Sequence, residues 1–317
     1  MGGVQVTVAA SVDLDAIECY HRIHALSAPV PQAARFAVLR KCLPRFAELV
    51  AKFGVKATFF TVGQDVLGDD EGRRLLGELA RQGHEVASHS HTHPYDLVLL
   101  PRARIARELD QASEALATTS GTAPVGFRAP GYEVNATVLE LLAERGYTYD
   151  SSTFASVPYY LAKALVMGSM KLLGRTSGSI LGSPRVLLAP TGIYRPSARN
   201  PYARGDVRLL ELPITVTPWL RLPVIGTALI TLPEPVRRLL VGSALRGSFF
   251  NLELHGIDLC DAQQDGLDAQ LIAKQPDLRV SLLRKQAALA STLQQCVDAG
   301  ARFAPLSQVA TEHADLV

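Results

Sequence analysis

The first 155 residues alternate between short apolar stretches and amphipathic stretches, and this alternation constrains the fold more than any other feature. The apolar stretches are expected to be strands, at residues 4–12, 56–62, 85–88, 125–127 and 147–149. Helical spacing of apolar residues predicts helices between them, at residues 33–53, 71–81, 102–118 and 136–145. Strands that alternate with helices pair in parallel through right-handed crossovers. The pattern therefore predicts an α/β fold, built on a parallel sheet or a barrel.

The rhythm breaks in the second half of the chain. Between residues 154 and 250 there are twelve Lys or Arg and three acidic residues, a local net charge of +9. The pattern then predicts a strand at 209–216, a strand at 248–254, a helix at 278–299 and a last strand at 303–309. We expect one domain over residues 1–317, with a basic, apolar insertion at about 154–247.

Bulk properties exclude several functional classes. The net charge is only +2, which argues against a nucleic-acid partner. The N-terminus begins an apolar strand without a basic segment, so no signal peptide is expected and the predicted location is cytoplasmic. The longest apolar stretch, 212–232, contains proline and arginine and does not predict a membrane span. Four scattered cysteines (Cys19, Cys42, Cys260 and Cys296) predict reduced or buried thiols rather than a disulfide framework.

Polar side chains follow most of the predicted strands at the point where each strand ends. In a barrel of strands and helices, the carboxyl ends of the strands form the face that carries active sites. We therefore expect these side chains to lie close together. They are Asp13, Asp15, His89, His93, Arg128, Asp150 and His255.

The segment Ser88–Pro94 contains three histidines in five residues. If it is extended, His89, His91 and His93 point the same way. If it is helical, His89 and His93 share one face. In both cases two imidazoles can reach one ion, and imidazole suits zinc and other first-row divalent metals. The alternative is a histidine-rich surface loop.

The nearby carboxylates complete a hydrolytic set. Asp13 or Asp15 offers the negative ligand that a divalent metal prefers. A second carboxylate can accept a proton from water, and a histidine on the opposite side can protonate a leaving amine. Such an arrangement favours metal-assisted hydrolysis of an amide.

These residues resemble the motifs of the polysaccharide deacetylases with a NodB homology domain, carbohydrate esterase family 4. The resemblance covers roughly residues 4–155 and 248–310. Its five motifs correspond to Asp13-Leu14-Asp15, to His89-Ser90-His91-Thr92-His93, to Arg128 with Pro130 and Tyr132, to Asp150, and to Leu252-Glu253-Leu254-His255. The family fold implies a deformed (β/α) barrel of about seven parallel strands, with the long insertion before the last strands.

The resemblance also implies a metal site. Asp15, His89 and His93 would be the ligands of one divalent ion, and His91 would not take part. Zinc is the first expectation for that ion, with cobalt, nickel or iron as alternatives.

The same resemblance implies catalytic roles. Asp13 would be the general base, and Arg128 would orient it and keep it ionised. A backbone N–H near Gly131 or Tyr132 would face the oxyanion. His255 would be the general acid, with Asp150 as its orienting partner. The alternatives are a surface cation for Arg128, a helix N-cap for Asp150 and a core histidine for His255.

The substrate hypothesis comes from two departures from the better-known members. Leu14 separates the two acids, and this split pair resembles the subgroup that includes cytoplasmic amide hydrolases of small or lipid-linked substrates. The insertion is apolar and basic at 157–173 and apolar at 220–232, which suits an anionic membrane or a lipid phosphate. We therefore expect a deacetylase or deformylase of an amino sugar on a polyprenyl phosphate or other lipid, peripheral at the inner membrane face.

Three other interpretations stay open at this point. The insertion could instead provide helices that cover the barrel and an interface of a homo-oligomer. The barrel could be a non-catalytic binder of carbohydrate or lipid. It could also be an amidase of a small molecule that is not a sugar, such as a ureide.

Overall fold

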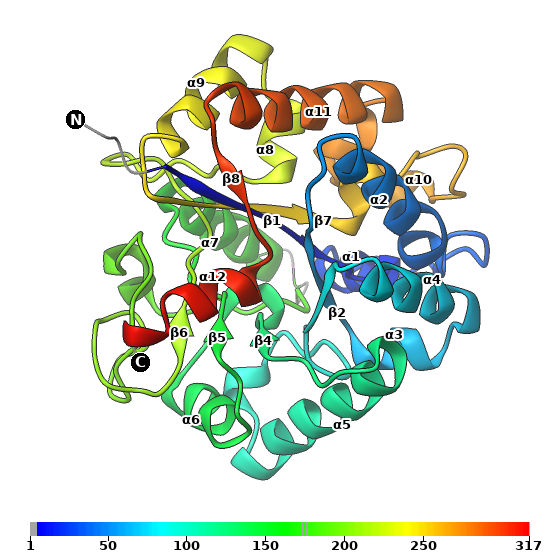
Figure 1. Cartoon of the computed structure of the whole chain (residues 1–317). Helices are drawn as coiled ribbons and strands as arrows, with labels where there is room; N and C mark the ends of the chain where they lie inside the picture. Colours follow the sequence, from blue (N-terminus) through cyan, green and yellow to red (C-terminus); the bar gives the residue numbers. More distant parts are fainter. Residues whose placement is uncertain (1–4, 173, 175–176, 317) are drawn as a thin grey trace.

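The structure is a computed structural model that describes residues 5–172, 174 and 177–316. Its strands form one parallel sheet in the order β6-β5-β4-β3-β2-β1-β7, and β8 also pairs with β1 (Figure 1). The strands are β1 (Thr7–Asp13), β2 (Thr58–Thr61), β3 (Glu85–Ser88), β4 (Gly126–Phe127), β5 (Tyr149–Asp150), β6 (Leu210–Glu211), β7 (Phe249–His255) and β8 (Arg302–Phe303). Val4 of the expected first strand, and Leu173 and Arg175 of the insertion, lie outside the described residues.

Helices surround this sheet and connect its strands. They are α1 (Ile17–Ile23), α2 (Leu43–Ala51), α3 (Gly63–Leu67), α4 (Asp70–Arg81), α5 (Arg102–Ser120), α6 (Ala136–Glu144), α7 (Val157–Leu172), α8 (Gly226–Thr231), α9 (Glu234–Ala244), α10 (Ala269–Lys274), α11 (Leu282–Asp298) and α12 (Leu306–Glu312). A short π-helical segment, η1 (Val38–Cys42), precedes α2, and a 3-10 turn, η5 (Gly256–Leu259), follows β7.

The sheet curves toward closure through the chain that follows β6. The N–H of Leu212 donates to the carbonyl of Asp150, and the N–H of Thr215 donates to the carbonyl of Asn251 on β7. Asn251 returns a bond from its own N–H to the hydroxyl of Thr215, at 2.9 Å. These contacts connect the two ends of the strand order, so the predicted deformed (β/α) barrel is confirmed.

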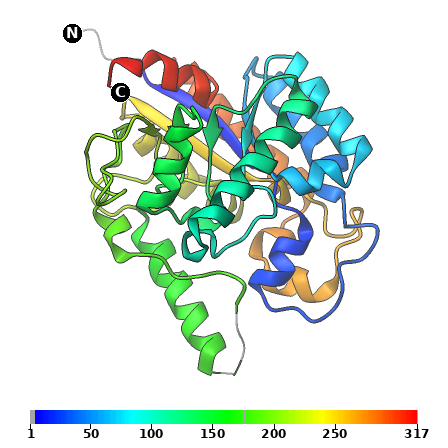
Figure 2. The ribbon, with the colours of Figure 1, turned by 90° about the horizontal axis from the view of Figure 1, so that it is seen from below.

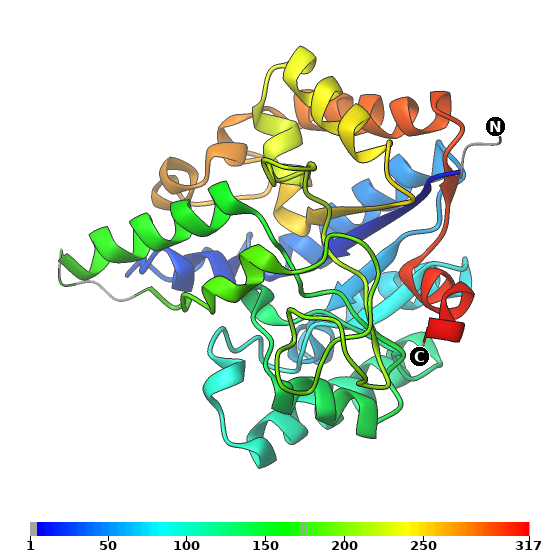
Figure 3. The same cartoon turned by 90° about the vertical axis from the view of Figure 1, so that its left-hand side faces the viewer.

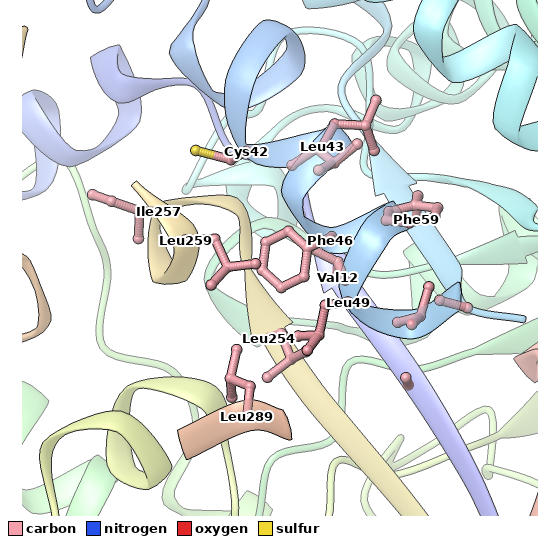
Figure 4. Close-up of a cluster of buried hydrophobic side chains, with 14 of the residues drawn as sticks. Val12, Cys42, Leu43, Phe46, Leu49, Phe59, Leu254, Ile257, Leu259 and Leu289 are labelled. Carbon is pink, nitrogen blue, oxygen red and sulfur yellow. The ribbon is translucent and has the colours of Figure 1, made fainter. Parts of the chain in front are cut away.

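The apolar faces of the helices meet the sheet in a close-packed core (Figure 4). Phe46 of α2, Phe59 of β2 and Leu254 of β7 are buried there with Leu289 of α11. Burial of such side chains stabilises the fold by about 1.5–3 kcal/mol each relative to full exposure. This core holds the ends of β1, β2 and β7 in fixed positions.

The predicted last strand, 303–309, is wrong over most of its length. The strand β8 ends at Phe303, and Leu306–Glu312 form α12. Pro305 stands at the N-cap of that helix, where its missing N–H has no cost. Leu306, Val309 and Ala310 are buried together because residues three and four apart share one helical face.

The expected insertion is a mixture of covering helices and one projecting helix. Helices α8 and α9 pack on α11, while the strand expected at 209–216 shortens to Leu210–Glu211. Helix α7 has no buried residue and extends away from the body of the molecule (Figures 2 and 3). Among the described residues, no helix combines the length and the apolar character needed to cross a bilayer. The assignment of one domain with an insertion at 154–247 stays a prediction.

Candidate active site

The carboxyl ends of the strands bring the predicted residues to one edge of the sheet. Asp13 is the register partner of His255 on β7 and of Phe60 on β2. On the other side, Phe127 pairs with both Ser88 and Asp150. Parallel pairing in this register places the residues that follow β3, β4 and β7 at one level, although they are far apart in sequence.

The histidine segment adopts neither the extended nor the helical conformation that its spacing suggested. It is a bent loop in which Ser90 and His93 have φ values of 63° and 55°, in the left-handed region. The loop brings the Nε2 atoms of His89 and His93 to 3.2 Å from each other. His91 is excluded from this pair, in agreement with the role expected for it.

Asp15 completes a three-residue cluster with His89 and His93. Its Oδ1 atom lies 3.1 Å from His89 Nε2 and 3.2 Å from His93 Nε2. Tetrahedral ligands held about 2.0–2.1 Å from zinc are separated by roughly 3.3–3.4 Å, close to these distances. Within the described part of the chain, Asp15 Oδ1 is buried without a hydrogen-bond donor. The three side chains therefore fit a divalent metal.

The orientation of His89 also suits metal binding. Its Nδ1 atom lies 2.6 Å from the carbonyl oxygen of Arg128, which directs the N–H to that side of the ring. The lone pair of Nε2 then faces the cluster, as in many metal-binding histidines. Burial alone would raise the pKa of Asp15, but His93 and His89 lower it well below its usual value. The carboxylate is therefore ionised, as a metal ligand must be.

Glu108 supports the histidine loop, and the sequence analysis did not identify it. Its Oε2 atom accepts the backbone N–H groups of His91 and Thr92, at 3.1 and 2.8 Å, and its Oε1 accepts the Thr92 hydroxyl at 2.8 Å. The sequence already placed Glu108 on the apolar face of the predicted helix 102–118, together with Ile105 and Leu109. In the structure this acid is buried. Such an acid requires nearby donors.

Asp13 and Arg128 form a buried ion pair beside this cluster. Arg128 Nη1 lies 2.6 Å from Asp13 Oδ1, and both side chains are almost fully buried. Arg128 also donates to the Ser151 carbonyl, the Ser151 hydroxyl and the Ser11 hydroxyl. Arg128 is therefore not a surface cation. Burial raises the pKa of Asp13 above its usual value, and the charge of Arg128 opposes that rise.

Glu253, and not Asp150, is the partner of His255. Glu253 Oε1 lies 2.9 Å from His255 Nδ1, and it also accepts the hydroxyl of Tyr132 at 2.9 Å. The hydroxyl of Tyr132 lies 3.1 Å from the other ring nitrogen of His255. Residues 253 and 255 point to the same side because they are two apart on one strand. Glu253 stands inside the motif Leu252–His255, so its position was visible in the sequence although its role was not.

Asp150 lies in a different network, which corrects its expected contact with His255. It accepts the hydroxyl of Ser152 at 2.6 Å, and Ser152 accepts the backbone N–H of Ala129 at 2.8 Å. Asp150 is also the register partner of Glu211 on the neighbouring strand β6. Burial and the charge of Asp150 raise the pKa of Glu211 well above its usual value. Asp150 thus supports the loop after Arg128.

Gly131 and Tyr132 form a left-handed turn next to His255, with φ values of 66° at both residues. The N–H of Tyr132 donates to the carbonyl of Ala129 at 3.0 Å, so it is not available to an oxyanion. The N–H of Gly131 has no backbone acceptor within the described chain. Of the two predicted oxyanion donors, Gly131 remains available among the described residues, and the hydroxyl of Tyr132 donates to Glu253.

A cavity of about 260 Å³ connects these groups. Its floor includes Asp13, Asp15, His89 and His255, and one wall comes from α7. The residues of α7 that line it are Tyr159, Ala162, Lys163, Val166 and Met167. A ligand in this cavity would touch the carboxylate cluster, the histidines and the insertion at the same time.

The strand ends of this parallel barrel thus carry two acids, two histidines and a separate acid–base pair. The model of the polysaccharide deacetylase family matches residues 37–149 of the chain. The family resemblance expected from the motifs is thereby confirmed.

Curated proteins with similar sequences carry related names. The chain is 28% identical over 121 residues to a peptidoglycan deacetylase of Helicobacter pylori, covering 38% of this chain and 40% of that protein. It is 30% identical over 112 residues to a chitin deacetylase of a Pestalotiopsis species, covering 35% and 37%. An uncharacterised protein of Bacillus subtilis, YlxY, is 35% identical over 107 residues, covering 34% and 31%. The chain thus spans about a third of the length of the curated relatives it matches.

Solved structures confirm the fold. A structure from Mycobacterium smegmatis, provisionally assigned as a polysaccharide deacetylase, superposes with a TM-score of 0.61 and 22% identity, covering 99% of this chain and 91% of that one. A Bacillus anthracis structure described as a pseudoenzyme of carbohydrate esterase family 4 superposes with a TM-score of 0.50 and 12% identity, covering 98% and 66%.

Proposed function

We propose that the protein is a metal-dependent hydrolase that removes an acetyl or formyl group from the nitrogen of an amino sugar. The observation that carries this proposal is the convergence of Asp13, the Asp15 cluster and His255 on one cavity. A protein that only bound sugars would need neither a base nor an acid beside the metal ligands. The same residues argue against a non-catalytic binder and give no support to a ureide as substrate.

The metal would be held by Asp15, His89 and His93. When bound, a divalent ion polarises an acyl oxygen and lowers the pKa of water, with zinc as the first expectation and cobalt, nickel or iron as alternatives. Arg128 holds one oxygen of Asp13, and the other oxygen accepts the proton of the attacking water. The Gly131 N–H stabilises the developing oxyanion. His255, held at Nδ1 by Glu253, donates its Nε2 proton to the leaving amine as the C–N bond breaks.

We propose further that the sugar is attached to a lipid phosphate. Leu161, Leu165 and Leu172 of α7 are 60%, 75% and 90% exposed, although the opposite side of the helix lines the cavity. Exposed apolar surface near the exposed Lys171, on a segment of net charge +9, suits an anionic bilayer or a lipid phosphate. This proposal includes a cytoplasmic location, peripheral at the inner membrane face, which fractionation of cells would test.

The first experiment measures metal content and turnover together. Elemental analysis of the wild type should find about one divalent ion per chain, and His93→Ala should lose it. The wild type should release acetate or formate from N-acetyl or N-formyl amino sugars, free or linked to polyprenyl phosphate. A wild type that binds the metal but hydrolyses none of these substrates would place the protein with the pseudoenzymes.

A second experiment tests the membrane contact separately. We expect the wild type to float with vesicles that contain phosphatidylglycerol and not with pure phosphatidylcholine. Leu165→Glu should reduce the bound fraction several-fold, because it places a charge on the apolar side of α7. The matched control is Leu283→Glu on α11, where the leucine is 77% exposed and away from the cavity. No enrichment of the wild type on anionic vesicles would remove the membrane claim and leave the amide hydrolase intact.

A further inference from the structure

Two cysteines that lie 218 residues apart in sequence meet in the core of the protein. Cys42 ends the segment η1, and Cys260 follows the turn η5. Their sulfur atoms are 3.0 Å apart, and both residues are completely buried. Figure 4 shows Cys42 at the margin of the core, beside the turn that carries Ile257 and Leu259. Cys19 and Cys296 are also buried, but neither belongs to this pair.

The residues that flank Cys42 hold the segment around Cys260 in place. Lys41 donates to the carbonyl of Gln264 at 3.0 Å, and Arg45 donates to the carbonyl of Leu259 at 2.8 Å. Arg45 also contacts Asp265, with Nη2 at 2.9 Å from Oδ1. The segment 256–266 is therefore attached to the start of α2 on both sides of Cys42. These contacts keep the two sulfurs together.

A metal ion is a poor occupant for this site, even though Asp265 lies near both sulfurs. The carboxylate of Asp265 is already used by Arg45, by Lys41 at 3.5 Å and by the N–H of Asp261 at 2.7 Å. The ammonium of Lys285 donates to the carbonyl of Cys260 at 2.9 Å and adds a further positive charge. A cation at this site would therefore have no free carboxylate as a ligand, and the positive charges of Arg45, Lys41 and Lys285 would repel it.

We propose that Cys42 and Cys260 form a reversible disulfide when the protein meets a small-molecule disulfide such as oxidised glutathione. One cysteine thiolate attacks a sulfur of the oxidant and releases one molecule of thiol. The other cysteine then attacks the mixed disulfide and releases the second molecule. Two electrons pass from the cysteine pair to the oxidant, and the two protons end on the released thiols.

The disulfide would link the segment that follows His255 covalently to the residue that precedes α2. A disulfide needs the sulfurs at about 2.05 Å, so the pair must approach by only about 1 Å. His255 directly precedes η5, and its N–H donates to Asp258 within that turn at 2.9 Å. The disulfide would join two cysteines 218 residues apart, and closing so long a loop removes much of the entropy of the unfolded chain. We expect the oxidised form to unfold at a temperature higher by about 5 °C or more.

The reaction is expected to be slow in the folded protein. The hydrogen bond with Cys42, together with burial, raises the pKa of Cys260 well above its usual value. The thiolate is the reactive form, so oxidation should be faster at alkaline pH.

The test compares the folded full-length protein after long incubation with oxidised glutathione at alkaline pH and after reduction. Free thiols are then alkylated under denaturing conditions and the protein is digested for mass spectrometry. We expect a peptide in which Cys42 is linked to Cys260, with Cys19 and Cys296 alkylated. Four alkylated cysteines after exhaustive oxidation, or a different pairing, would overturn the proposal.

Variants provide a second readout. The oxidant should raise the unfolding temperature of the wild type and of Cys296→Ser, which removes a different buried thiol. It should not raise that of Cys42→Ser. An equal rise in Cys42→Ser would show that another effect of the oxidant is responsible. If Cys42→Ser does not fold, the peptide map of the wild type decides alone.

Discussion

The carboxylate of Glu253 lies 2.9 Å from Nδ1 of His255, two residues further along the same strand. Burial alone would lower the pKa of His255, but the charge of Glu253 raises it well above its usual value. The pair is therefore a carboxylate next to an imidazolium. This state suits a group that must donate a proton to a leaving amine.

The pair predicts a specific pH dependence. Because His255 must be protonated to act as an acid, kcat/KM should fall only as the pH rises through its raised pKa, above the usual value of about 6.5. Glu253→Gln removes the charge that raises this pKa, so the alkaline limb should move to lower pH. Glu211→Gln, in a buried carboxylate pair away from His255, should keep the wild-type limb. A limb that stays in place in Glu253→Gln would contradict the acid role.

Asp13 should be required for turnover but not for metal binding. Asp13→Asn removes the basic oxygen while it keeps an acceptor for Arg128, so kcat should fall by about 100-fold or more. Elemental analysis should find the same metal content as in the wild type, because Asp15, His89 and His93 are unchanged. Undiminished turnover in this variant would remove the base assignment, and loss of metal would assign Asp13 to the metal site instead.

Glu108 should act on the metal through the histidine loop. Glu108→Ala removes the acceptor of the N–H groups of His91 and Thr92, so metal affinity should fall about 10- to 100-fold. Titration of the apo protein with zinc or cobalt measures this affinity. Glu114→Ala, at an exposed position of the same helix, is the control and should bind like the wild type. Equal affinities in the two variants would show that the loop does not depend on Glu108.

Gly126 should be irreplaceable for packing. A Cβ atom there would overlap the ring of Tyr149, whose hydroxyl is held by Glu85 at 2.8 Å. Gly126→Ala should therefore lower the free energy of unfolding by about 1–3 kcal/mol. Gly168→Ala is the matched control, because nothing lies within 4 Å of its Cβ position on α7. Helix propensity should make that control neutral or slightly stabilising. Urea denaturation measures both, and equal stabilities would refute the steric argument.

The sequence by itself determined the parallel fold and the residues that could hold the metal. Both follow from local pattern, because short, mainly apolar strands alternate with amphipathic helices and Asp13, Asp15, His89 and His93 stand where strands end. The prediction from local pattern was wrong at residues 303–309, because Leu306, Val309 and Ala310 after Pro305 have helical spacing and form one face of α12.

The tertiary structure alone decided which side chains meet. Asp150 and Glu253 are both acids at or near a strand end, and only the sheet shows that Glu253 holds His255 while Asp150 pairs with Glu211. The contact between Cys42 and Cys260 has the same origin. The proximity of Asp150 to Glu211 and the contact of Cys42 with Cys260 join residues separated by tens or hundreds of positions, and they depend on strand order, register and packing rather than on local spacing. Sequence periodicity specifies the face on which a side chain lies, whereas the assembled barrel specifies its neighbour.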